Sequence, residues 1–103
     1  MADFQTVAKA AEIAPGEMKL GNVADQDIVV ANVDGAFFAF GNECTHVGGP
    51  LAEGELEGES VTCPWHATKF NVKTGQASQG PGTSPVPTFE VRLEGGDIQI
   101  AKP

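Results

Sequence analysis

The hydrophobic positions along the chain come in short runs that alternate with polar residues or are rich in β-branched side chains. Residues 27–33 form the strongest of these runs, and residues 36–40 follow after only Asp34 and Gly35. Two residues of this type between strand-like runs indicate a type I′ turn, because glycine tolerates the positive φ that the turn requires. The pattern therefore predicts a β-hairpin.

Glycine and proline divide the remaining sequence into further short segments. Residues 8–14 predict a single helical turn, which Pro15 and Gly16 end, and residues 79–87 predict an ordered, proline-rich loop. No segment has the periodicity of a longer helix, so the pattern predicts an all-β fold, a small antiparallel β-sandwich or barrel. The other strands are expected at residues 4–7, 17–23, 55–57, 59–62, 69–72, 89–94 and 97–101.

A length of 103 residues is that of one domain, and we expect a single domain over residues 1–103. A hydrophobic fraction of 41% is typical of a globular protein. No apolar run approaches the ~18 residues of a membrane-spanning helix, and the N-terminus lacks the basic and apolar regions of an export signal. We therefore expect a cytoplasmic monomer that does not associate with a membrane.

Fourteen acidic and six basic residues give the chain a net charge of -8. This charge argues against binding to nucleic acid or to an anionic membrane surface. A protein partner should offer a basic docking face, although the charge is equally compatible with a role in solubility alone. If residues 55–59 formed one strand, Glu55, Glu57 and Glu59 would share a face, as a docking patch or as a solvated surface.

Both cysteines and both histidines of the chain lie in one stretch, as Cys44-x-His46 and Cys63-x-x-His66 with sixteen residues between the pairs. Each pair falls in a predicted loop. In the cytoplasm, two thiols indicate a metal or redox site more often than a disulfide, which would also leave both histidines unexplained. Zinc is compatible with two cysteines and two histidines, although zinc fingers usually order them Cys, Cys, His, His.

The ligand pattern C-x-H, sixteen residues, C-x-x-H resembles that of the Rieske iron–sulfur proteins. Residues 44–51 and 63–70 also resemble the two cluster-binding loops of that family, and residues 80–87, with Pro81, resemble the proline-rich loop that covers its cluster. The resemblance extends over most of the chain from about Asp27 onward. It implies a Rieske-type fold with a cluster-binding subdomain of two loops at about residues 41–87.

In a Rieske centre, two histidines replace two cysteines on one iron of a [2Fe–2S] cluster. The resemblance therefore implies one such cluster, with Cys44 and Cys63 on one iron and His46 and His66 on the other. Because imidazoles are neutral where thiolates are charged, this ligand set is less negative than four cysteines. Adding an electron then costs less, and the reduction potential rises.

The resemblance also suggests roles for residues near the ligands. Backbone N–H groups at Gly48 and Gly49 would point at sulfur, and Trp65 would shield the cluster. Respiratory members of the family have a bracing disulfide and two hydroxyl donors, whereas the matching positions here are Gly49, Trp65, Thr68 and Phe70, of which only Thr68 keeps a hydroxyl. Fewer donors stabilise the reduced cluster less, so we expect a potential nearer about −150 mV than +300 mV.

The similarity to soluble Rieske ferredoxins of bacterial oxygenase systems implies a one-electron carrier between a flavin-containing NAD(P)H reductase and a terminal oxygenase for aromatic substrates. No histidines remain for a mononuclear iron site, and no dinucleotide-binding fingerprint is present, so we expect the chain not to be an enzyme by itself. Two alternatives remain open at this point: the small subunit of an assimilatory nitrite reductase, and a zinc-binding interaction module.

Overall fold

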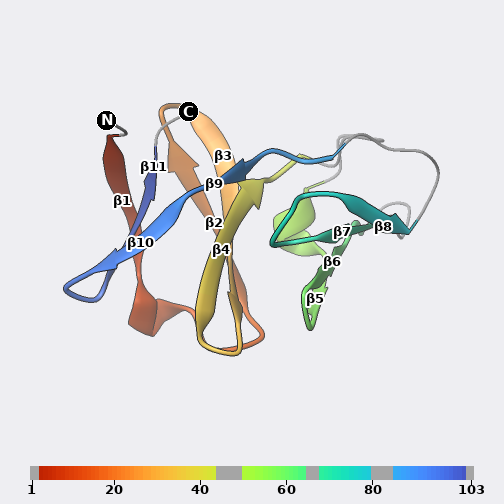
Figure 1. The fold of residues 1–103 in the computed structure, drawn as a ribbon, viewed down its shortest axis with the longest axis horizontal. Helices are drawn as coiled ribbons and strands as arrows, with labels where there is room; N and C mark the ends of the chain where they lie inside the picture. Colours follow the sequence, from red (N-terminus) through yellow and green to blue (C-terminus); the bar gives the residue numbers. More distant parts are fainter. Residues whose placement is uncertain (1–2, 44–49, 65–67, 80–84, 102–103) are drawn as a thin grey trace.

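The structure, a computed structural model, describes residues 3–43, 50–64, 68–79 and 85–101. Within these ranges the chain forms three antiparallel sheets and two short 3-10 helices (Figure 1). The first sheet has the order β1 (Phe4–Lys9), β11 (Asp97–Ala101), β10 (Val91–Glu94), and the second β2 (Met18–Val23), β3 (Gln26–Val33), β4 (Ala36–Gly41), β9 (Thr88–Phe89). The third has the order β5 (Glu55–Glu57), β6 (Ser60–Thr62), β7 (Lys69–Asn71), β8 (Ala77–Gln79), and the 3-10 helices are η1 (Ala10–Glu12) and η2 (Leu51–Glu53).

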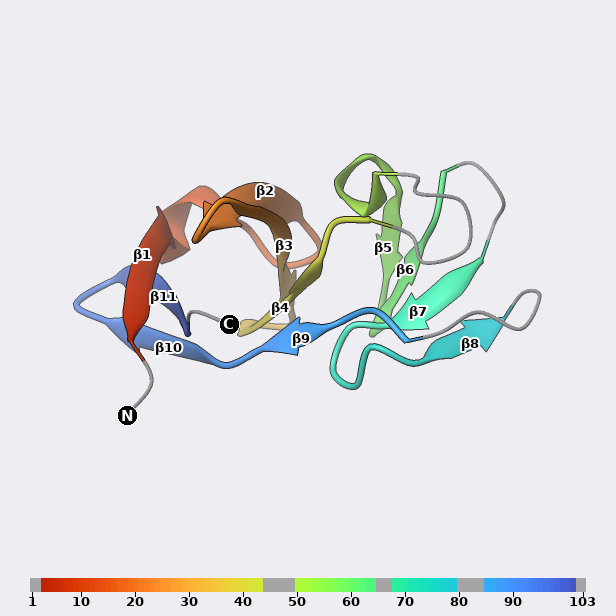
Figure 2. The same ribbon diagram turned by 90° about the horizontal axis from the view of Figure 1, so that it is seen from above.

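The first two sheets curve toward each other to form a barrel, and the third sheet lies beside it as a smaller lobe (Figure 2). The all-β prediction is therefore confirmed. No helix in the described ranges has the length and apolar character needed to cross a bilayer.

Strand β3 is buried on both of its faces. Ile28 and Val30 belong to the barrel core, whereas Val29 and Ala31 belong to a second core that extends into the smaller lobe. Successive side chains of a strand point to opposite faces, so the part of a strand that lies between two cores is apolar at successive positions. This explains why the centre of β3, from Ile28 to Ala31, reads as a continuous apolar run and not as an alternation.

The predicted hairpin is confirmed as β3 and β4, which are paired through Val33 and Ala36 at the turn. The two turn residues, Asp34 and Gly35, have φ values of 52° and 95°. Positive φ at both positions is the requirement of a type I′ turn.

The prediction of one strand over residues 89–94 is wrong, because the strand is interrupted at Glu90. Before the break, β9 pairs with β4, and after it, β10 pairs with β11. The segment therefore crosses from the second sheet to the first. The alternation of apolar and polar residues continues through this crossing, so the sequence does not show where one strand ends and the next begins.

Some elements differ from the sequence expectation in smaller ways. The helical turn expected at residues 8–14 is reduced to η1, while η2 and β8 lie in segments for which no element was predicted. The β2–β3 hairpin turns at Ala24 and Asp25, both with positive φ (51° and 66°). An alanine with positive φ is uncommon and carries no turn signal in the sequence.

Candidate metal centre

The second of the two loops predicted to carry ligands, which starts at Cys63 and is called the second ligand loop below, begins where β6 ends. Cys63 follows directly after Thr62, and its backbone N–H donates to the carbonyl oxygen of Thr68 at 2.8 Å, which closes the loop before β7 starts. Cys63 is only 1% exposed and packs in one core with Val61 and Phe70. The thiol-bearing residue is thus held by a paired strand on each side of its loop.

The first of these predicted loops, called the first ligand loop below, contains residues 44–49 and follows β4. An isolated bridge joins Glu43 to Pro50, and the chain then enters η2 at Leu51, which is fully buried in the same core as Cys63. The segment that leaves the first loop therefore packs against the segment that enters the second.

A glycine contact brings these two segments still closer. A Cβ atom at Gly54 would overlap the carbonyl oxygen of Thr62, the residue before Cys63. Only glycine permits this approach of one backbone to another. The side chains of Glu53, Glu55 and Cys63 line an open hollow of about 370 Å³ at this point.

Several of the residues singled out in the sequence lie outside the described residues: Cys44, His46, Gly48, Gly49, Trp65, His66 and Pro81. Of the four proposed ligands, only Cys63 is described. The structure also describes Thr68 and Phe70. The site is therefore defined by the bases of its two loops, which the structure places against one core.

Phe70 and Thr68 differ in what surrounds them. Phe70 is fully buried and pairs with Val61 across β6 and β7, so its ring is a core residue beside Cys63. Thr68 is also fully buried, yet its hydroxyl has no hydrogen-bond partner among the described residues, and nor has that of Thr62. A buried hydroxyl without a partner costs about 1–3 kcal/mol. The Thr68 hydroxyl therefore needs an acceptor that the described residues do not supply.

The glutamates between the ligand loops do not form one strand face. The chain turns at Gly58, where φ is 58°, so Glu59 leaves the strand on which Glu55 and Glu57 lie. Glu59 instead forms an ion pair with Lys73 at 2.8 Å. The hydrogen bond from Lys73 lowers the pKa of the Glu59 carboxyl group below its usual value. Glu55 and Glu57 are exposed, on either side of the half-buried Leu56.

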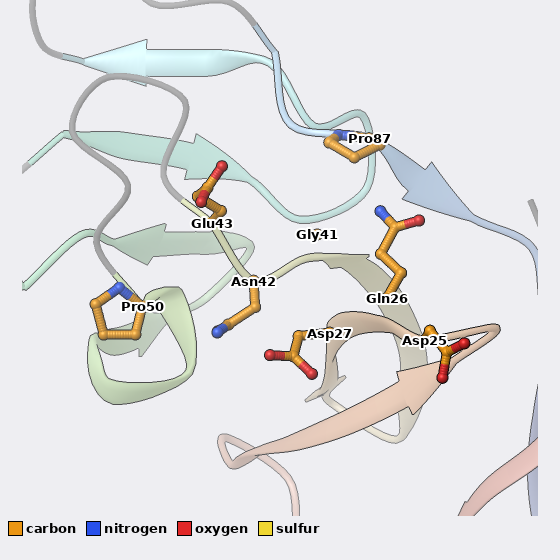
Figure 3. Close-up of a pocket in the computed structure, with 8 residues that line it drawn as sticks. All are labelled: Asp25, Gln26, Asp27, Gly41, Asn42, Glu43, Pro50 and Pro87. Atoms are coloured by element: carbon orange, nitrogen blue, oxygen red, sulfur yellow. The ribbon is translucent and has the colours of Figure 1, made fainter.

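A second hollow, of about 460 Å³, lies beside the base of the first loop (Figure 3). Its acidic side chains are Asp25, Asp27 and Glu43, and Pro50 and Pro87 line it as well. Asp25 and Asp27 are distant from Glu43 in sequence, and nothing in the spacing indicated that the three residues would line one hollow. The acidic surface at this end of the molecule is therefore wider than the sequence suggested.

Residues 3–90 match the family model of the Rieske [2Fe-2S] domain. The chain belongs to the Rieske family. The ferredoxin component of biphenyl 2,3-dioxygenase from Rhodococcus jostii (strain RHA1) is 40% identical over 94 residues, which are 91% of this chain and 88% of that relative. The similarity thus spans nearly the whole length of both proteins.

Solved structures give the same result. This Rieske chain superimposes on the Sphingomonas yanoikuyae B1 ferredoxin with a TM-score of 0.92 at 30% identity, covering 98% of this chain and 100% of that one. A chain in the complex of reduced oxygenase and oxidized ferredoxin in carbazole 1,9a-dioxygenase gives a TM-score of 0.89 at 33% identity, covering 95% and 92%.

The cofactor of this Rieske protein is one [2Fe–2S] cluster of the two-cysteine, two-histidine type, and not the zinc ion of the alternative interpretation. The described residues fit this group. Cys63 is a buried free thiol, and the Thr68 hydroxyl beside it needs an acceptor such as a cluster sulfur. When bound, the cluster accepts and releases a single electron.

The Thr68 hydroxyl leads to a first prediction. Thr68→Val keeps the shape of the side chain but removes the donor, and should lower the midpoint potential by about 60 mV, the equivalent of one hydrogen bond of about 1.4 kcal/mol that favours the reduced cluster. Thr68→Ser keeps the hydroxyl and should stay near the wild-type value. Redox titration of the three proteins measures the effect. Equal potentials for Thr68→Val and the wild type would show that the hydroxyl does not contact the cluster.

Proposed function

We propose that the chain is a one-electron carrier that receives electrons from a flavin-containing NAD(P)H reductase and delivers them to a terminal oxygenase of the aromatic-ring-hydroxylating type. The observation that carries this proposal is the match over 91% of the chain to a dioxygenase ferredoxin component. A ferredoxin of similar fold is bound to its oxygenase in the carbazole 1,9a-dioxygenase complex, which supports the oxygenase as partner. That a flavin-containing reductase supplies the electron is the more specific part of the proposal.

The same proposal includes the state of the molecule. Residues 1–103 form one domain and act as a cytoplasmic monomer that is not catalytic alone. The core shared by β3, β4 and the smaller lobe supports a single domain, because neither lobe could separate without exposing Val29 and Phe40. The relatives are electron-transfer components of larger systems, which supports a carrier without its own substrate.

The proposed ligand set is Cys44, His46, Cys63 and His66. The buried backbone of Cys63 holds one thiolate in a fixed position, and the first loop approaches it through Leu51. Gly48, Gly49, Trp65 and Pro81 are proposed to surround the cluster, as they would in the family. The polypeptide has no other cysteine or histidine that could replace a ligand.

Ligand removal tests this assignment. Cys63→Ala and His66→Ala should each be purified without the visible absorbance, the iron and the acid-labile sulfide of the cluster, because the chain offers no substitute ligand. Val61→Ala changes another buried residue of the same core and should retain the cluster. A full visible spectrum in Cys63→Ala or His66→Ala would disprove the assignment.

The potential is the next prediction. Because only Thr68 offers a side-chain hydroxyl at the positions where respiratory members have two, the midpoint should be negative, near about −150 mV. A redox titration monitored by the EPR signal of the reduced cluster measures it. The reduced protein should then transfer its electron to an oxygenase of the dioxygenase type, whereas a clearly positive midpoint would contradict the low-potential carrier.

Charge reversal tests where the partners dock. The double variant Glu55→Lys/Glu57→Lys should slow electron transfer roughly tenfold at low ionic strength, because attraction to a basic face of the partner becomes repulsion. The difference should shrink as salt screens the charges.

A matched control changes the net charge equally at the other end of the molecule. Glu94 and Asp97 pair across the turn of the β10–β11 hairpin. This turn lies at the end of the barrel away from the third sheet (Figure 1). Glu94→Lys/Asp97→Lys should therefore leave the low-salt rate close to that of the wild type. Equal slowing by both double variants would assign the effect to net charge and not to docking beside the cluster.

A further inference from the structure

Asn42 joins the two segments that lie directly before and directly after residues 44–49. Its backbone carbonyl oxygen accepts a hydrogen bond from the N–H of Leu51 at 2.7 Å, and its side-chain Oδ1 accepts one from the N–H of Ala52 at 2.9 Å. A single residue before the first ligand loop thus binds two successive N–H groups after it. In Figure 3, Asn42 lies between Pro50 and Asp27.

Asn42 is itself fixed to the barrel. Its N–H donates to the carbonyl oxygen of Asp27 at 3.3 Å, and the neighbouring Gly41 donates to the carbonyl oxygen of Pro87 at 2.9 Å. The bridge between Glu43 and Pro50 lies directly beyond it. The hydrogen bonds to Leu51 and Ala52 therefore connect the far end of the loop to a rigid element.

The connection continues to the second ligand loop. Leu51 shares a core with Cys63, and two residues after Ala52 the backbone of Gly54 meets the carbonyl oxygen of Thr62. Because η2 is only three residues long, the position of its first N–H groups determines where Leu51 and Gly54 lie. A change at Asn42 thus reaches Cys63 through packed neighbours.

We propose that Asn42 is a positioning residue for the cluster, whose side-chain Oδ1 fixes the first ligand loop relative to Cys63. The inference rests on the ligand set of the proposed function. Without the Oδ1 acceptor, the N–H of Ala52 loses its partner and η2 loosens. The segment that follows the first ligand loop is then held less firmly relative to Cys63, and the cluster should be lost more readily.

Asn32 offers a matched control elsewhere in the fold. Its Oδ1 also accepts a backbone N–H, that of Gly35 at 2.8 Å, and its Nδ2 donates to the carbonyl oxygen of Ile13 at 2.8 Å. Asn32 is 4% exposed and lies by the β3–β4 turn, at the end of the hairpin opposite to Asn42. Its loss should weaken the barrel without altering the base of a ligand loop.

The test compares Asn42→Leu, Asn42→Asp and Asn32→Leu as purified cluster-loaded proteins. Three quantities are measured: the EPR spectrum of the reduced cluster, the rate at which visible absorbance is lost with an iron chelator, and the thermal unfolding midpoint by circular dichroism. The chelator experiment is carried out well below the lowest unfolding midpoint. Asn42→Ala serves as a second variant if Asn42→Leu does not fold.

The expected results separate positioning from general stability. Asn42→Leu should lose its cluster about tenfold faster than the wild type, as the loss of one hydrogen bond allows, and should show broadened or shifted EPR lines. Asn42→Asp keeps an oxygen acceptor and should restore the wild-type line shape. Asn32→Leu should unfold at a lower temperature but keep the wild-type EPR spectrum and rate of cluster loss.

Two results would overturn the inference: a wild-type EPR spectrum and rate in Asn42→Leu, or equal acceleration of cluster loss in Asn32→Leu. A wild-type protein without a Rieske EPR signal would instead contradict the proposed function. The failure of one proposal can therefore be distinguished from the failure of the other.

Discussion

The burial of both faces of the β3–β4 hairpin is the constraint on which the rest of the structure depends. Ile28 and Val30 face the barrel core, and Val29 faces the core that also contains Cys63. Because side chains alternate along a strand, shifting this hairpin by one residue would exchange the contents of the two cores. Its register is therefore strongly determined. Strand β4 ends at Gly41, shortly before the first ligand loop. That loop therefore starts from a strand whose register is fixed.

Local chemistry made part of this structure predictable. The β3–β4 hairpin follows from two adjacent turn residues. The Rieske-type cluster follows from the resemblance of the cysteine and histidine pattern to that family, while the four individual ligands stay a prediction. The break at Glu90 could not be predicted, because it depends on which distant strand each half pairs with. The same holds for Ala24, whose positive φ is imposed by the pairing of β2 with β3 and not by its own preference. The role of Asn42 depends on contacts with residues nine and ten positions away.

The site combines a buried interior, which contains Cys63, with charged residues at the surface around it. Cys63 and Thr68 are buried, whereas Glu43, Glu53 and Glu55 nearby are exposed. Burial removes water from the thiolate, so hydrogen bonds from the protein must replace those of the solvent when an electron is added. The number of such donors is then one determinant of how stable the reduced state is. A site with few hydrogen-bond donors has a lower reduction potential, so its reduced form gives up an electron readily.

The exposed carboxylates act differently from the buried donors, because salt separates their effects. Charges at the surface are screened over about 8–10 Å at moderate ionic strength, while interactions within the buried site are screened much less. The acidic residues of the hollow beside Asn42 and of β5 therefore influence the approach of a partner more than they influence the potential. The potential and the docking rate can accordingly change independently, the first through residues such as Thr68 and the second through residues such as Glu57. An electron carrier can thus change how fast it docks without changing the energy of the electron it transfers.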